Sequence, residues 1–161
     1  MITDKDRIHL ERTVALAETA LVKGNEPFGS VLVSETGEVL FEDHNHIGSG
    51  DDTLHPEFAI VRWAAANLTR EQRAAATVYT SGEHCPMCAA GHGMVGLGRI
   101  VYASSAEQYG QWLTEMGVET PLVNPLPINA ISPRIPVEGP VPELAEQVRG
   151  LLQTLYTSRG Y

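Results

Sequence analysis

Segments with helix-like and strand-like patterns alternate along residues 3–116, and this alternation limits the possible folds more than any other feature. Apolar residues recur at helical spacing from Thr3 to Lys23, and Gly24 and Asn25 end that helix. Alternation of this kind predicts a layered α/β domain. The other expected elements are strands at 28–34, 38–42, 77–81 and 99–104, and helices at 55–68, 87–97 and 106–116.

The last forty residues differ in composition from the rest. Seven prolines lie between Pro121 and Pro142, which excludes a regular helix or a central strand there. We expect an extended surface segment over 121–142, with a last strand at 121–124. Helical periodicity returns over 142–156. No internal repeat or second-domain boundary is visible, so residues 1–161 are expected to form a single domain.

Charge and hydropathy narrow the class of partner. The formal net charge is −9 and the chain has only 11 Lys and Arg, which disfavours a polyanionic partner such as DNA or RNA. No apolar run approaches the ~20 residues that span a bilayer. The N-terminus lacks the basic start and apolar middle of a signal peptide. These features predict a cytoplasmic protein that acts on a small, roughly neutral molecule.

Two short segments carry residues suited to metal chemistry. They are His55-Pro56-Glu57 and Cys85-Pro86-Met87-Cys88, and each lies where a loop meets an expected helix. Proline is tolerated in a first helical turn, and a helix N-terminus favours thiolate. A catalytic zinc ion takes three protein ligands and keeps its fourth position for water. His55, Cys85 and Cys88 supply that number of ligands, and Glu57 is placed to move protons beside them.

The cysteine pair has other interpretations. A Cys-x-x-Cys pair alone fits a redox dithiol or a disulfide, although a structural disulfide is disfavoured in a cytosolic protein. A thioredoxin-like pair would follow the first strand of a βαβ unit, whereas this pair follows the third expected strand. A structural zinc site needs a fourth protein ligand. The candidates for that ligand are His44, His46, His84 and His92.

The two segments together resemble the H-x-E and P-C-x-x-C signature of zinc nucleobase deaminases. The wider sequence is similar to the cytidine deaminase superfamily, in its branch of guanine, fungal-type cytosine and tRNA adenosine deaminases. The similarity covers the N-terminal helix to about Ser105, and residues 121–161 show none. The segments that carry it are EPFGSVLV (26–33), Asn45, DTLHPE (52–57), EHCPMC (83–88) and GRIVYAS (98–104).

The resemblance implies a three-layer α/β/α sandwich around a five-stranded mixed sheet, and homodimers. His55, Cys85 and Cys88 match the family's zinc ligands, and Glu57 matches its proton shuttle. Asn45 matches a base-binding asparagine, and Phe28 an aromatic residue that stacks on the base.

The chain departs from the family pattern in two places. His84 stands where the family has proline, and the loop from Asn45 to His55 is one residue short. Both departures concern the pocket, so we list His84 as a substrate contact. Glu83 has two interpretations: it could hold the cysteine loop in place through hydrogen bonds, or it could contact the substrate. Three aromatic residues could cover the pocket or simply pack in a helix or at a frayed end: Trp112, Tyr156 and Tyr161.

These features predict hydrolytic deamination of a small amino-heterocycle, with Zn²⁺ activating the water and ammonia released. Free bases of the guanine or cytosine type and amino-triazine analogues are the expected substrates. Two alternatives stay open. One is a tRNA adenosine deaminase, and the other is a zinc-stabilised binding module without enzymatic activity.

Overall fold

The N-terminal helix begins at a well-defined cap. In the computed structural model, which describes residues 1–161, helix α1 spans Asp4–Val22. The Thr3 hydroxyl accepts from the Asp6 backbone N–H, and the Asp6 carboxylate accepts from the Thr3 N–H in return. This reciprocal pairing satisfies N–H groups that the first turn leaves free. Gly24 follows the helix with a φ of 85°, which suits glycine.

Five strands form one mixed sheet in the order β2-β1-β3-β4-β5. Strand β1 pairs with β2 and with β3 in antiparallel fashion, while β3–β4 and β4–β5 are parallel. The five-stranded mixed sheet predicted from the sequence is therefore confirmed. The strands are β1 (Gly29–Val33), β2 (Val39–His44), β3 (Thr77–Gly82), β4 (Ile100–Ser104) and β5 (Val137–Glu138).

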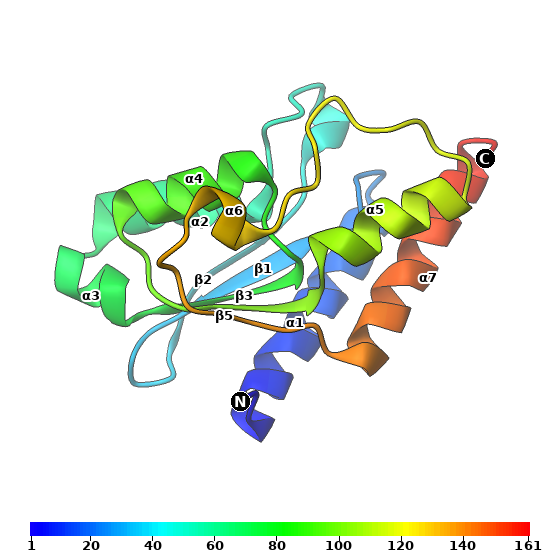
Figure 1. Cartoon of the computed structure of the whole chain (residues 1–161). Coiled ribbons are helices and arrows are strands. Elements are labelled where there is room, and N and C mark those ends of the chain that lie inside the picture. The colour runs from blue at the N-terminus through cyan, green and yellow to red at the C-terminus, as the bar shows by residue number, and fades with distance from the viewer.

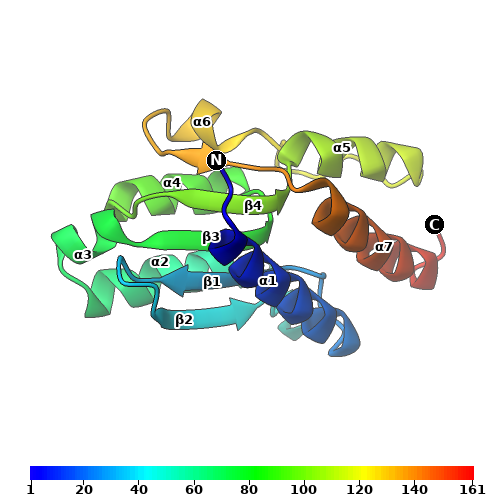
Figure 2. The ribbon, with the colours of Figure 1, turned by 90° about the horizontal axis from the view of Figure 1, so that it is seen from below.

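Helices cover both faces of this sheet (Figure 1). Helices α1 and α7 pack on one face, and α2 packs on the other with α4 beside it (Figure 2). The remaining helices are short and flank these layers, and none of the helices is long and apolar enough to cross a bilayer. Their bounds are α2 (Pro56–Asn67), α3 (Arg70–Ala75), α4 (Pro86–Val95), α5 (Ala106–Glu115), α6 (Ile128–Ile131) and α7 (Pro142–Ser158), with a 3₁₀ turn, η1, at Ile47–Ser49.

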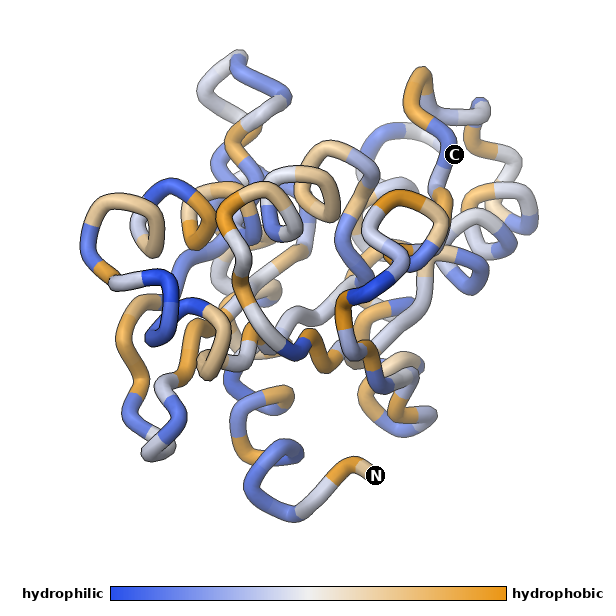
Figure 3. Tube along the Cα trace, turned by 60° about the vertical axis from the view of Figure 1, so that its left-hand side comes forward, coloured by the Kyte–Doolittle hydropathy of each residue, from blue (hydrophilic) through white to orange (hydrophobic).

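Alternate side chains of each strand enter two separate cores. Val31 and Val33 point to the core shared with α1, α5 and α7, whereas Leu32 points to the core under α2 and α4. This follows from the period-2 geometry of a strand. Hydrophobic and hydrophilic residues alternate along the helices (Figure 3), as expected for helices with one buried face.

The end of the chain corrects one prediction. The strand expected at 121–124 is absent, and that segment is exposed at Leu122 and Val123. The fifth strand is instead the two-residue β5, which lies inside the proline-rich segment. Proline on either side is tolerated because β5 occupies the sheet edge and pairs only with β4. Helices α3 and α6 were also not predicted, since each is too short to show a periodicity.

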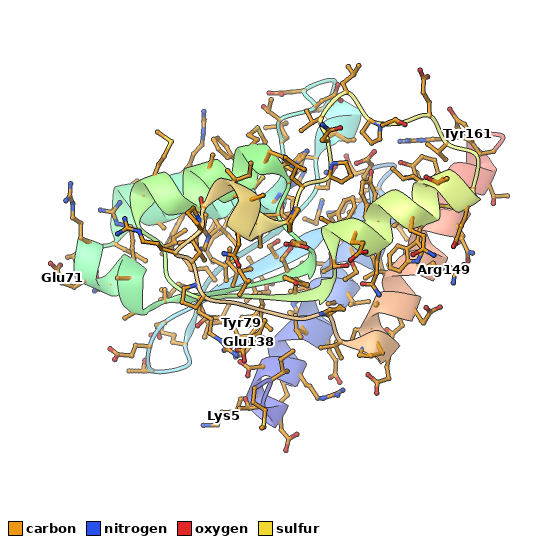
Figure 4. The ribbon with its side chains drawn as sticks, viewed as in Figure 1. Lys5, Glu71, Tyr79, Glu138, Arg149 and Tyr161 are labelled. Atoms are coloured by element: carbon orange, nitrogen blue, oxygen red, sulfur yellow. The ribbon has the colours of Figure 1, made fainter.

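A polar cluster ties α1 to the start of the parallel strands. Asp6 is only 4% exposed and accepts from Arg99 Nη1 at 2.8 Å and from the Tyr79 hydroxyl at 2.7 Å. Arg99 also donates to Glu138 on β5. Tyr79 and Glu138 lie together beneath the sheet in Figure 4, at the edge of a cleft of about 520 Å³. Burial opposes the charged form of Asp6, but its hydrogen bonds outweigh burial and lower the pKa of this carboxyl.

We therefore expect Asp6→Asn to lower the free energy of unfolding at pH 7 by about 2 kcal/mol, because a charged hydrogen bond is lost. A carboxyl with a depressed folded pKa stabilises fully above its ordinary value of 3.8, and that stability is lost as the pH falls towards the folded pKa. Urea unfolding of wild type and variant between pH 7 and pH 3 measures this. The difference in free energy of unfolding between wild type and Asp6→Asn should shrink below pH 3.8. A difference that stays constant over this pH range would contradict the depressed pKa of Asp6.

Candidate active site

The starts of two neighbouring helices bring the three expected metal ligands together. His55 is the N-cap of α2 and Cys85 is the N-cap of α4, each followed by proline in the first turn. Helices α2 and α4 pack against each other, and a Cβ at Gly91 would come within 2.9 Å of the Phe58 ring. Glycine at this position therefore permits the close approach. Both helix N-termini carry partial positive charge, which favours thiolate between them.

The donor atoms form a nearly equilateral triangle. His55 Nδ1 lies 3.5 Å from Cys85 Sγ and 3.6 Å from Cys88 Sγ, and the two sulfur atoms are 3.6 Å apart. Tetrahedral zinc with bonds of ~2.3 Å to sulfur and ~2.0 Å to nitrogen requires separations of about 3.5 Å for S···N and about 3.8 Å for S···S. The residues therefore fit a zinc ion in both donor type and spacing.

Without a metal ion, only one of the three ligands, Cys85, has a pKa low enough to favour the deprotonated form that a metal binds. The hydrogen bond with Cys88, followed by the contact with His55, lowers the pKa of Cys85 to about 4. The same hydrogen bond together with burial raises the pKa of the Cys88 thiol. Burial lowers the pKa of His55, but the neighbouring Cys85 and Glu57 outweigh it and raise it to about 9. Zinc binding displaces the protons that these groups hold.

No fourth protein ligand joins this group. The group of possible ligands whose donor atoms all lie within 4.8 Å of one another contains only His55, Cys85 and Cys88. His44 and His46 belong to a separate surface group with Asp43, and both ring nitrogens of His44 are already engaged, by Asn45 O and Lys23 Nζ. The structural-zinc interpretation therefore lacks the ligand that it requires, whereas three ligands are the number at catalytic zinc.

Glu57 lies beside the ligand triangle and is held from the sheet side. It is 5% exposed, and its Oε1 accepts from the Thr80 hydroxyl at 2.8 Å and faces the Ser30 hydroxyl at 3.2 Å. Its Oε2 lies 3.9 Å from Cys88 Sγ. Burial raises the pKa of Glu57. A carboxyl whose pKa is closer to neutral pH can more readily both accept and return a proton.

Ser30 and Thr80 were not predicted as site residues. Their positions are directly opposite in the register of β1 and β3, and Ser30 Oγ lies 2.9 Å from Thr80 Oγ1. Because each hydroxyl has one proton, Ser30 can donate to Thr80 while Thr80 donates to Glu57. Small hydroxyl residues are common in strands, so only the strand register could have indicated this role.

Phe28 and Asn45 lie next to each other, as a shared base-binding role would require. The Asn45 backbone N–H donates to Phe28 O at 2.9 Å. Asn45 Oδ1 accepts from the Ile47 N–H, and its amide nitrogen has no protein acceptor. The half-buried Phe28 ring packs on Gly82 and meets the Tyr109 ring edge-on, with centroids 5.9 Å apart. The Asn45 amide and the Phe28 ring are therefore available for the roles that the resemblance implies.

Glu83 and His84 have different surroundings. Glu83 Oε1 accepts from Ile128 N and its Oε2 from Ala106 N, both at 2.8 Å, so this side chain caps α6 and α5. The His84 ring is 1% exposed and lies 5.3 Å from the His92 ring, with no hydrogen-bond partner. These contacts favour bracing over substrate contact for Glu83, and burial leaves His84 little access to a substrate.

Comparison with known proteins agrees with this geometry. Residues 3–104 match the family described as the cytidine and deoxycytidylate deaminase zinc-binding region. A probable cytosine deaminase of Schizosaccharomyces pombe is 32% identical over 145 residues, which are 86% of each chain. A tRNA-specific adenosine deaminase of Agrobacterium fabrum is 31% identical over 65% of this chain and 70% of its own.

Solved structures show the same fold. A guanine deaminase from Nitrosomonas europaea superposes with a TM-score of 0.68 over 96% of this chain and 85% of its own, at 16% identity. The family match, the three-ligand group and the carboxylate beside it agree with one another. The chain therefore belongs to the cytidine and deoxycytidylate deaminase family, whose members are zinc-dependent deaminases that hydrolyse a C–N bond.

Proposed function

We propose that this enzyme deaminates a small free amino-heterocycle, with nucleobases of the guanine or cytosine type as the leading substrates and amino-triazines as analogues. The observation that carries the proposal is Glu57, which two hydroxyls hold beside a ligand triangle with no fourth protein ligand. The yeast relative named as a probable cytosine deaminase supports a free base, because the similarity extends over 86% of both chains.

The chemistry divides between the metal and the protein. His55, Cys85 and Cys88 would hold the zinc ion, which would supply Lewis acidity to activate a water for attack. Glu57 relays the two protons of the water one after the other, the first to a ring nitrogen and the second to the departing amine. Water oxygen replaces the amino group at the ring carbon, so the products are a carbonyl compound and ammonia.

Other side chains orient the reactants. Thr80 and Ser30 fix Oε1 of Glu57, which leaves Oε2 on the side of Cys88. We assign Phe28 as the surface on which the base stacks and the Asn45 amide nitrogen as a donor to a ring acceptor. The homodimer implied by the family resemblance stays a prediction.

Metal analysis tests the ligand set. We expect Cys88→Ala to lose bound zinc, because two ligands hold the ion far less tightly than three. His92→Asn, a buried histidine outside the triangle, should retain it and serves as the matched control. The measurement is zinc content per chain after dialysis. If His92→Asn released zinc as readily as Cys88→Ala, a four-ligand structural site would replace the catalytic one.

Activity tests the proton shuttle. A panel of cytosine, guanine and amino-triazines should release ammonia with zinc-loaded protein, and Glu57→Gln should lower kcat by roughly 10²–10⁴-fold because the amide cannot carry the proton. Zinc content of the variant should stay unchanged. Glu71→Gln, at an exposed position on α3, is the control. Unchanged activity in Glu57→Gln would contradict the mechanism.

A tRNA adenosine deaminase is the second candidate, favoured by the similarity to the Agrobacterium fabrum enzyme. RNA affinity depends on basic contacts to phosphate, and a net charge of −9 offers few. We expect no detectable binding of a tRNA anticodon stem-loop at 100 mM salt in a filter-binding titration. Binding that weakens steeply as salt rises would instead support the tRNA substrate.

A further inference from the structure

Glu26 is a half-buried carboxylate without a hydrogen-bond donor. Its side chain is 22% exposed, and its nearest charged partner is Arg159 Nη1 at 3.8 Å, beyond hydrogen-bond length. Every other carboxylate that is not exposed accepts at least one hydrogen bond, namely Asp6, Glu42, Asp43, Glu57, Glu83 and Glu138. A carboxylate in such a partly sheltered position, with no donor from the protein, is free to accept a hydrogen bond from a ligand.

The surroundings of Glu26 form one side of the substrate region. Glu26 lies two residues before Phe28, in the connection between α1 and β1, which Figure 1 shows between the η1 loop and the ends of α5 and α7. Tyr109 packs against Phe28, and burial followed by the negative charge of Glu26 raises the pKa of this phenol. The Arg159 guanidinium lies over the Tyr156 ring, with 5.6 Å between them.

Glu26 also interacts with the metal-ligand side of the site. Burial raises the pKa of its carboxyl, and the charges of Arg159 and His55 oppose that rise. The carboxylate is therefore close enough to His55 for their charges to interact, and it belongs to the connection that leads into Phe28. A group in this place meets the part of a bound ring that extends beyond the reacting carbon.

We propose that Glu26 is a specificity-determining residue that accepts a hydrogen bond from the ring N–H of a free base. The inference rests on the proposed function. In a nucleoside or nucleotide, the sugar replaces the hydrogen on this nitrogen, so the carboxylate loses its donor and meets carbon instead. A phosphate would in addition approach the negative charges of Glu26 and the nearby Asp52. The site therefore takes free bases and rejects their N-substituted forms.

Methylated bases test this hydrogen bond directly. The zinc-loaded full chain is compared on cytosine against 1-methylcytosine and on guanine against 9-methylguanine. Wild type should prefer the N–H form by roughly 10–100-fold in kcat/KM, the range expected when a charged acceptor loses its donor. Glu26→Met keeps the side-chain volume without an acceptor and should bring the ratio close to one. Glu26→Gln keeps an acceptor oxygen without charge and should give an intermediate ratio.

Control measurements separate steric exclusion and misfolding from hydrogen bonding. Glu35→Gln, in the exposed turn between β1 and β2, should keep the wild-type ratio. Zinc content and thermal unfolding should match in all variants. If Glu26→Met retained the wild-type preference, the preference would be steric and the inference would be wrong. Equal turnover of both forms by wild type would overturn it as well.

Binding measurements distinguish this inference from the proposed function. Each base and its N-methylated form are titrated calorimetrically into the zinc-loaded Glu57→Gln variant, with and without Glu26→Met. This titration reports affinity without turnover. If wild type deaminates no base, yet Glu57→Gln binds the N–H form with a Glu26-dependent preference, the proposed function fails and this inference stands. If none of these bases binds, both fail.

Discussion

The close packing of α2 against α4 is the constraint on which the site depends. Three ligands separated by thirty residues of chain come within 3.6 Å only because two helix N-termini start side by side. Gly91 permits this approach, since a side chain there would meet the Phe58 ring. The same packing points the partial positive charge of both helices at the thiols. Metal binding therefore inherits its geometry from a helix contact in the core rather than from the loops.

The sheet supplies the second half of the chemistry. Glu57 is in the first turn of α2, yet the groups that fix its carboxylate are on β1 and β3, where Ser30 and Thr80 are paired in register. A shift of one residue in that register would put the two hydroxyls on opposite faces of the sheet. Helix packing thus places the three ligands, while strand register orients the carboxylate that we propose as the proton carrier. The two must agree for Oε2 of Glu57 to remain beside Cys88.

The ligands could be predicted from the sequence because their signal is local: each segment combines a donor, a helix-starting proline and fixed spacing. The alternation of strands and helices predicted a layered α/β domain, and the family resemblance implied the mixed sheet. The position of the fifth strand could not be predicted, because two residues at a sheet edge among prolines show no periodicity. The strand was instead predicted at the apolar residues of 121–124. Glu83 was ambiguous for a related reason. Its partners, Ala106 and Ile128, are distant in sequence, and only the fold brings both N–H groups to one carboxylate.

Reaction type and substrate choice depend on different parts of this molecule. The ligand triangle, Glu57 and its hydroxyls belong to helices and strands whose displacement would disturb two cores. The groups that we propose as contacts to the rest of the base, Glu26, Phe28 and Asn45, lie at strand ends and in connections. Glu26 is beside the C-terminal turn that carries Arg159. Such segments tolerate change at lower cost than packed elements. Glu26 accepts no hydrogen bond from the protein in such a place, so a ligand N–H would complete its hydrogen bonding only in the bound state.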